Sequence, residues 1–179
     1  MRHERVIEAV MANGTVLPLR FGTRLQSEAE LVDAMADRHD ELASAIDRVR
    51  GQTEIGLRVI PRDSDHRRQA RGAKRPSGRA YLLDRASEHH LAERVKNEIH
   101  LELINVATAH VLATRLGPPA ILAASYLVSD DEVETFREQA RKLAEPIKEV
   151  QCFVTGPWPP YNFVDLRDLP SQEGRRGKP

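Results

Sequence analysis

Residues 61–79 contain no large apolar side chain and separate two regions that are rich in them. This stretch holds seven basic and two acidic residues and is bounded by Pro61 and Arg79. It cannot bury one face in a core, so it predicts a flexible linker or loop. A basic loop is usually solvated, and contact with an anionic partner is the alternative. The chain is therefore expected to fold as two segments, 1–60 and 79–166, joined by a basic linker over 61–78.

The pattern before the linker predicts a helix over 2–12, a strand over 15–21, a helix over 27–51 and a strand over 53–60. Pro18 cannot donate a ladder hydrogen bond, so the first strand is expected at a sheet edge or with a bulge. Ser27 and Glu30 form a capping box that begins the second helix, and Gly51 ends it. Alternation in the second strand places Ile55, Leu57 and Val59 on one face of a strand that is half-buried.

The pattern after the linker predicts a long helix over 79–116, a strand over 120–128, a helix from Ser129 to Pro146 and a strand over 150–155. Apolar residues about four apart mark the long helix: Leu91, Val95, Ile99, Leu103 and Val106. The continuous apolar run of the first strand favours a central strand buried on both faces, although periodicity does not exclude a buried helix. Ser129 and Glu132 suggest a second capping box.

The repeated order of helix and strand predicts an α+β fold class with modules of ferredoxin-like type. The first module, 1–60, has only two strands, so its sheet is expected to be incomplete and to need strands from elsewhere. The second module, 79–166, is expected to be a complete α+β domain with a long helix. The polar tail, 167–179, is expected to be disordered.

Composition excludes several classes of protein. The 27 basic and 27 acidic residues give a net charge of zero, which argues against a dedicated nucleic-acid-binding domain. The single cysteine, Cys152, excludes an internal disulfide framework and fits a reducing cytoplasm. No run of about 18 apolar residues is present and the N-terminus is charged, which argues against a membrane span and a signal peptide. These features indicate a soluble, cytoplasmic protein.

No catalytic or metal-binding motif emerges from the spacing of reactive residues. The seven histidines include no His-Glu-x-x-His pattern, and His89 and His100 are too far apart on one helix to share an ion. Cys152 lies in a strand, where a small buried hydrophobe is the more common role. Glu98 and Glu102 have basic neighbours and are typical of a solvated face. We therefore expect no catalysis, cofactor or metal.

Aromatic residues concentrate near the C-terminus. Four of the eight aromatics fall within 11 residues that also contain three prolines: Phe153, Trp158, Tyr161 and Phe163. One interpretation is a rigid segment that packs its rings across the second module. The other is a preorganised surface for a protein partner, because proline restricts the segment before binding. The two interpretations are compatible.

The same segment, Thr155–Val164, resembles the C-terminal signature of the gas vesicle protein family of the GvpL/GvpF type. Four further stretches resemble that family in the same order: Arg2–Val10, Val16–Thr23, Ser77–Leu83 and Ala124–Val128. The resemblance implies an accessory or minor structural protein of gas vesicles, located with the vesicle in the cytoplasm. It also implies a modified ferredoxin-like N-terminal domain, an α+β C-terminal domain and contact with the small hydrophobic shell protein. Family members usually carry a further N-terminal segment with the first strand, so this domain is expected to lack that strand.

The partner surface expected under this resemblance combines the edge strand near position 16 with the aromatic segment. Its candidate residues are Val16, Leu17, Leu19, Phe21, Trp158, Tyr161 and Phe163. Backbone pairing at a strand edge is a general way to recognise an extended peptide. The expected partners are the shell protein and other gas vesicle proteins, with no nucleic acid and no membrane. The alternative function is a small-molecule-binding or catalytic ferredoxin-like domain that uses a cleft between the modules.

Overall fold

The computed structural model describes residues 2–19, 25–62, 77–114, 116 and 119–164. The chain divides into two compact units, Thr53–Trp158 and Met1–Gln52 with Pro159–Pro179. The α+β class is confirmed, because helices and a four-stranded sheet both occur. The expected linker residues 63–76 and the tail 167–179 lie outside the described residues.

The unit Thr53–Trp158 follows the order strand, helix, strand, strand, helix, strand. The strands are β1 (Gln52–Pro61), β2 (Ala109–Leu112), β3 (Leu122–Ser129) and β4 (Val150–Trp158). The helices are α5 (Gly78–Val95), a π-helical turn (Lys96–His100), α6 (Leu101–Ile104), a 3-10 turn (Asp130–Glu132) and α7 (Val133–Ala144). The sheet order is β2-β3-β1-β4, and this order of elements is that of a ferredoxin-like fold.

Strand β1 lies inside this sheet, which differs from the expected division of the chain. The sequence pattern places residues 53–60 in an N-terminal module, but in the structure they pair antiparallel with β4, from Pro61 opposite Val150 to Glu54 opposite Trp158. The reason is packing: Ile55, Leu57 and Val59 are almost completely buried in one core with β3, α7 and the π turn. The ferredoxin-like arrangement therefore belongs to residues 53–158 rather than to residues 1–60.

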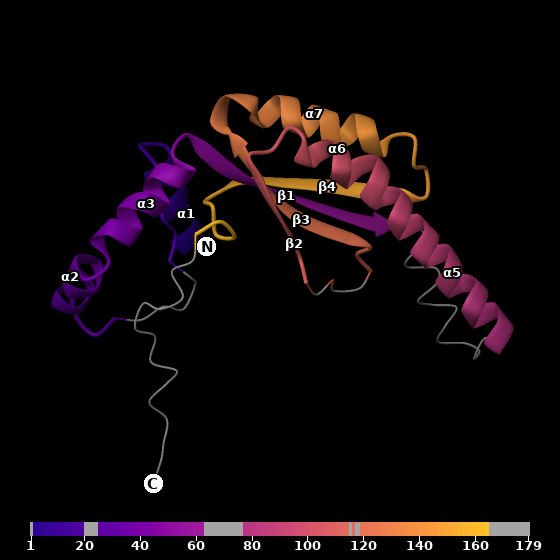
Figure 1. Ribbon diagram of the computed structural model, residues 1–179, viewed down its shortest axis with the longest axis horizontal. Helices are drawn as coiled ribbons and strands as arrows, with labels where there is room; N and C mark the ends of the chain where they lie inside the picture. Colours follow the sequence, from indigo (N-terminus) through magenta and orange to yellow (C-terminus); the bar gives the residue numbers. More distant parts are fainter. Residues whose placement is uncertain (1, 20–24, 63–76, 115, 117–118, 165–179) are drawn as a thin grey trace, which may run out of the picture. The chain divides into compact units, whose positions relative to one another are not determined.

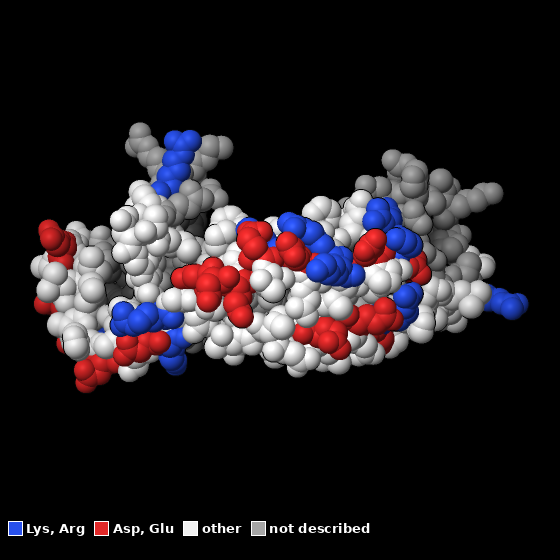
Figure 2. Space-filling view, turned by 90° about the horizontal axis from the view of Figure 1, so that it is seen from above, with Lys and Arg blue, Asp and Glu red and all other residues white. Residues whose placement is uncertain are grey.

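One face of the sheet carries all the helices of this unit. Figure 1 shows α5, α6 and α7 on the same side of the four strands. The core between the layers includes Tyr126 of β3 and Phe136 of α7, whose rings lie 5.1 Å apart. Figure 2 views the molecule from the helical side, where acidic and basic side chains are interspersed. A surface of mixed charge is typical of a solvated helix layer.

The long helix expected over 79–116 is shorter and changes its winding. Helical structure ends at Ile104, and residues 109–112 form strand β2, which the apolar pattern did not predict. The π turn has a physical reason in the four-residue spacing of Val95, Ile99 and Leu103, which are all fully buried. An α-helix turns about 100° per residue, so each four-residue step rotates the stripe by about 40° away from the core. The π turn contains more residues per turn than an α-helix, so it compensates for this rotation and keeps the stripe against the core.

The capping predictions have opposite outcomes. The Ser27 hydroxyl accepts the N–H of Glu30 at 3.1 Å and begins α2 (Glu28–Ala36), as the capping box predicts. The box at Ser129 is wrong, because that hydroxyl donates to Asp131 Oδ1 at 2.5 Å and α7 begins only at Val133. The Ser129 hydroxyl makes no capping hydrogen bond, and Asp130–Glu132 form a 3-10 turn before α7 begins.

The unit that contains residues 1–52 begins with α1 (Arg2–Met11), which matches the expected first helix. The single helix expected over 27–51 is divided into α2 and α3 (His39–Val49). The break follows from the sequence, since residues 37–41 are all polar and leave a gap in the apolar stripe. At the break, Arg38 forms a two-pronged ion pair with Glu41.

Strand β4 contains one extra residue near its end. Glu54 pairs with Trp158 and Gly56 with Thr155, so three steps on β4 match two on β1. Gly156 occupies this bulge at φ +107°, in the region that glycine tolerates best. A Cβ at Gly156 would lie 2.7 Å from the Glu54 carbonyl oxygen. The bulged end of β4, from Thr155 to Trp158, is called the corner below. The Thr53 hydroxyl also stabilises this corner, because it donates to the Trp158 carbonyl at 3.0 Å.

Gly156→Ala is therefore expected to destabilise the protein by about 1–3 kcal/mol through backbone strain and the clash with Glu54. Urea denaturation measures this loss. Gly78→Ala is the matched control, because a Cβ there meets no atom within 4 Å and alanine favours the helix. Equal stability of Gly156→Ala and the unaltered chain would show that the corner does not need glycine.

Candidate functional site

The N-terminal part of the expected partner surface does not form a strand. Residues 15–19 are irregular, and Phe21 lies outside the described residues. Val16, Leu17 and Leu19 are half-buried, and Pro18 is buried. The strand prediction is wrong for 15–19, because β-rich composition alone does not supply a hydrogen-bonding neighbour and Pro18 removes one donor. Residues 15–19 therefore offer no preformed strand edge for backbone pairing.

The C-terminal part of that surface is divided between the two units. Trp158 ends β4, where it is half-buried and its indole N–H donates to Thr155 Oγ1 at 3.3 Å. Tyr161 is exposed and Phe163 half-buried in a turn in which the Tyr161 amide donates to the Pro159 carbonyl at 2.7 Å. Trp158 thus has a structural role at the corner, whereas Tyr161 presents a ring to solvent. Phe153 of β4 is also exposed, at 47%.

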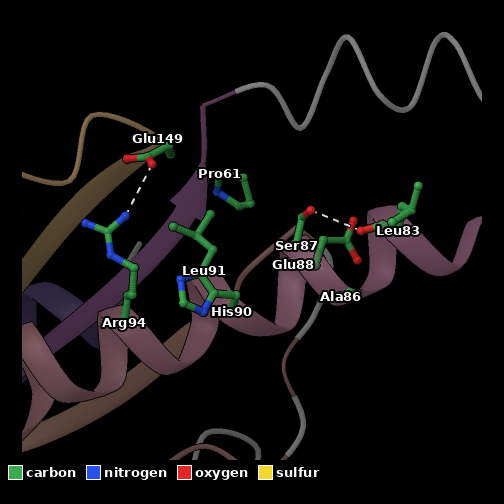
Figure 3. Close-up of a pocket in the computed structure, with 9 residues that line it drawn as sticks. All are labelled: Pro61, Leu83, Ala86, Ser87, Glu88, His90, Leu91, Arg94 and Glu149. Carbon is green, nitrogen blue, oxygen red and sulfur yellow. Dashed lines mark hydrogen bonds and ion pairs between the residues drawn. The ribbon is translucent and has the colours of Figure 1, made fainter. Parts of the chain in front are cut away.

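A groove of about 500 Å³ lies between α5 and the ends of β1 and β4. Figure 3 shows its lining, in which Leu91 points toward Pro61 and Arg94 reaches Glu149. Arg94 is paired at 3.2 Å with Glu149 and at 3.3 Å with Glu98, and these carboxylates raise its pKa. Ser87 donates to the carbonyl of Leu83 at 3.0 Å within the helix.

These contacts decide what the groove can do chemically. The Arg94 guanidinium stays charged and is paired with carboxylates. The Ser87 hydroxyl donates its hydrogen bond to the helix backbone. General acid–base catalysis needs a group whose pKa lies near the working pH. A permanently charged guanidinium does not meet that need. The groove, which Glu88 and His90 also line, lies within residues 53–158.

The contact between His100 and His110 is the main feature that the sequence did not predict. His100, in the π turn, is only 2% exposed, and its Nδ1 lies 2.7 Å from the hydroxyl of Tyr126. The ring of His110, on β2, meets His100 edge-on with centroids 5.2 Å apart. Burial lowers the pKa of His100, and the nearby His110 and Lys96 lower it further. Burial likewise raises the pKa of Tyr126. His100 and the Tyr126 hydroxyl therefore both stay neutral at pH 7.

Cys152 behaves as the sequence suggested. It is half-buried on β4 and packs against the core, and burial raises the pKa of its thiol to about 11. A thiol with so high a pKa is a poor nucleophile at neutral pH. Within the described residues, no three His, Cys, Asp or Glu side chains gather as a metal site would require. None of the helices in that part of the chain has the length and apolar character needed to cross a membrane.

Comparison with known proteins identifies the family. The profile of the family described as gas vesicle synthesis protein GvpL/GvpF matches residues 1–165. The chain belongs to this family. Gas vesicle protein L of a Streptomyces species is 29% identical over 93% of this chain and 68% of its own length. Gas vesicle protein F of Haloferax mediterranei is 26% identical over 97% of this chain and 73% of its own length.

Solved structures agree on the fold. The crystal structure of GvpF from Anabaena superposes with a TM-score of 0.68 at 20% identity, covering 90% of this chain and 72% of that one. GvpF from Microcystis aeruginosa gives a TM-score of 0.65 at 17% identity, with coverage of 90% and 75%. The family resemblance seen in the sequence is thereby confirmed, and membership of this family supports a role in gas vesicle formation.

The neutral His100 gives a testable pH dependence. Its pKa in the folded state lies below the ordinary 6.5, so the unfolded chain takes up a proton first as the pH falls. Stability is therefore complete above about pH 6.5 and declines below it, by at most about 1.4 kcal/mol per pH unit for one proton. His100→Gln should flatten this decline in urea denaturation between pH 7.5 and 5.

His39→Gln is the control for that experiment, since the His39 side chain is exposed on α3. It should leave the decline unchanged. If His100→Gln and the unaltered chain lost stability equally over this range, protonation of His100 would not be the cause.

Proposed function

We propose that this protein is a non-enzymatic accessory or minor structural protein of gas vesicle assembly, and that it binds the small hydrophobic shell protein. The observation that carries the proposal is the family match over residues 1–165, which spans both units. Two further observations support a binding role. The Arg94 guanidinium and the Ser87 hydroxyl of the groove beside α5 are both engaged by other groups, and the Cys152 thiol is protonated at neutral pH.

Other gas vesicle proteins are further proposed partners. The side chains proposed to contact them are those of the expected surface: Val16, Leu17, Leu19, Phe21, Trp158, Tyr161 and Phe163. Because residues 15–19 are not a strand, this recognition would use side chains and not backbone pairing. Aromatic rings are enriched in protein interfaces, and an exposed ring such as that of Tyr161 fits this use.

Co-purification tests the proposal directly. The tagged full-length chain, co-expressed with the shell protein of the same gene cluster, should retain that protein on the affinity resin. The control is the same lysate with an untagged chain. Recovery of the shell protein at the level of this control would refute shell binding.

A double substitution tests the side-chain surface. Leu17→Lys combined with Leu19→Lys should weaken capture of gas vesicle partners at least tenfold, because burying an unpaired ammonium group in an interface is costly. Leu17→Met with Leu19→Met keeps the apolar character and is the control. Thermal unfolding of both variants checks that the fold survives. Undiminished capture by a folded lysine variant would remove these residues from the interface.

A further inference from the structure

One asparagine of this chain is followed by glycine, and it lies directly after α1. The chain contains four asparagines, and the residues that follow the other three carry large side chains: Glu98, Val106 and Phe163. Asn13 and Gly14 are both exposed in the turn that follows Met11, the last residue of α1. Asn13 is therefore the asparagine whose following backbone nitrogen is least shielded by a side chain.

The backbone nitrogen of Gly14 is also weakly held. Its N–H donates a long hydrogen bond, of 3.4 Å to the Met11 carbonyl, whereas about 2.9–3.0 Å is usual. A Cβ placed on Gly14 would meet no atom of the described residues within 4 Å, so the space beside the backbone is open. Glycine has the widest choice of backbone conformations. The nitrogen can therefore turn toward the Asn13 side chain at little cost.

The Asn13 side chain caps the end of α1. Its Nδ2 donates to the Ala9 carbonyl at 2.8 Å, which satisfies one of the last carbonyls of the helix. This hydrogen bond must open before the side chain can react. The end of α1 has little packing to oppose the opening, because Ala9 and Val10 are exposed.

We propose that Asn13-Gly14 is a self-modification site, at which Asn13 is converted to aspartate and isoaspartate without an enzyme. The Gly14 nitrogen attacks the side-chain carbonyl carbon of Asn13, so that a new C–N bond forms and the bond to Nδ2 breaks. The displaced amide nitrogen leaves as ammonia and carries away the proton of the Gly14 N–H. Water then opens the cyclic imide. Opening at the side-chain carbonyl gives aspartate, and opening at the main-chain carbonyl gives isoaspartate.

The product is unfavourable for α1. The new carboxylate cannot donate to the Ala9 carbonyl, and it places a negative charge at the helix end that is already negative. The chain, whose net charge is zero, gains one negative charge. Modification is therefore expected to loosen α1 and to move the protein toward the acidic side in isoelectric focusing. The reaction needs no partner, so its test is independent of shell binding.

Incubation of the purified full-length chain in mildly alkaline buffer tests the site. Tryptic digestion and mass spectrometry quantify conversion at all four asparagines in one sample, and Asn13 lies in the peptide 6–20. We expect at least tenfold more conversion at Asn13 than at Asn97, Asn105 or Asn162, with isoaspartate among the products. All four asparagines are exposed, so the other three are internal controls for exposure.

Gly14→Ala is the matched variant for the attacking residue. The added Cβ has room and the φ of Gly14 lies outside the left-handed region, so the fold should be retained. Conversion at Asn13 should slow at least tenfold, since the methyl group crowds the nitrogen and restricts the backbone. Asn13→Gln keeps a side-chain amide and should show no acidic shift, whereas Asn13→Asp should migrate with the converted fraction. Circular dichroism and the urea midpoint check that the variants are folded.

Two results would overturn the proposal. Equal conversion at all four asparagines would remove any special role of the Asn13-Gly14 turn. Conversion of Asn13 that a folded Gly14→Ala chain does not slow, or that yields aspartate without isoaspartate, would indicate direct hydrolysis and contradict attack by the Gly14 nitrogen.

Discussion

Pairing of β1 with β4 is the interaction on which the rest of the sheet depends. It joins the first and last strands of the unit Thr53–Trp158, as the bond between Thr53 and Trp158, 105 residues apart, illustrates. Strand β1 also lies beside β3, whose neighbour Ile121 donates its amide to the Val59 carbonyl at 2.9 Å. Without β1, the β2–β3 hairpin and β4 would have no common partner. The helices would then have no continuous sheet to cover.

The same pairing explains part of the signature at the end of β4. Gly156 provides the backbone conformation of the bulge, and Thr155 accepts the indole N–H of Trp158. Arg137 reaches the Gly156 carbonyl from α7, which ties the helix layer to the corner. The beginning of this motif therefore serves the fold, although its aromatic content also suggested a binding surface. Exposed rings in the same region, such as that of Tyr161, are available for partners.

The sequence predicted elements with a local signal and missed what depends on distant contacts. The apolar run of β3 and the stripe through Phe136 of α7 identified both elements, and β3 does lie inside the sheet. Strand β2 was not predicted because its few apolar residues continue the helical spacing. These residues form a strand because they pair with β3, which lies later in the chain. The placement of β1 was missed because strand partners are chosen by packing. Of the site, the aromatic segment was visible, whereas the contact between His100 and Tyr126 requires the tertiary fold.

Hydrogen exchange of backbone amides in the full chain tests most directly whether β1 is the central strand of residues 53–158. Amides that open only when the whole unit unfolds have a protection that corresponds to the global free energy of unfolding. The account predicts that Leu57 and Val59 exchange as slowly as the interior of β3, and that both slow together when stability is raised. Exchange of β1 at the rate of α3, with β3 still protected, would contradict it, because β1 would then unfold with residues 1–52.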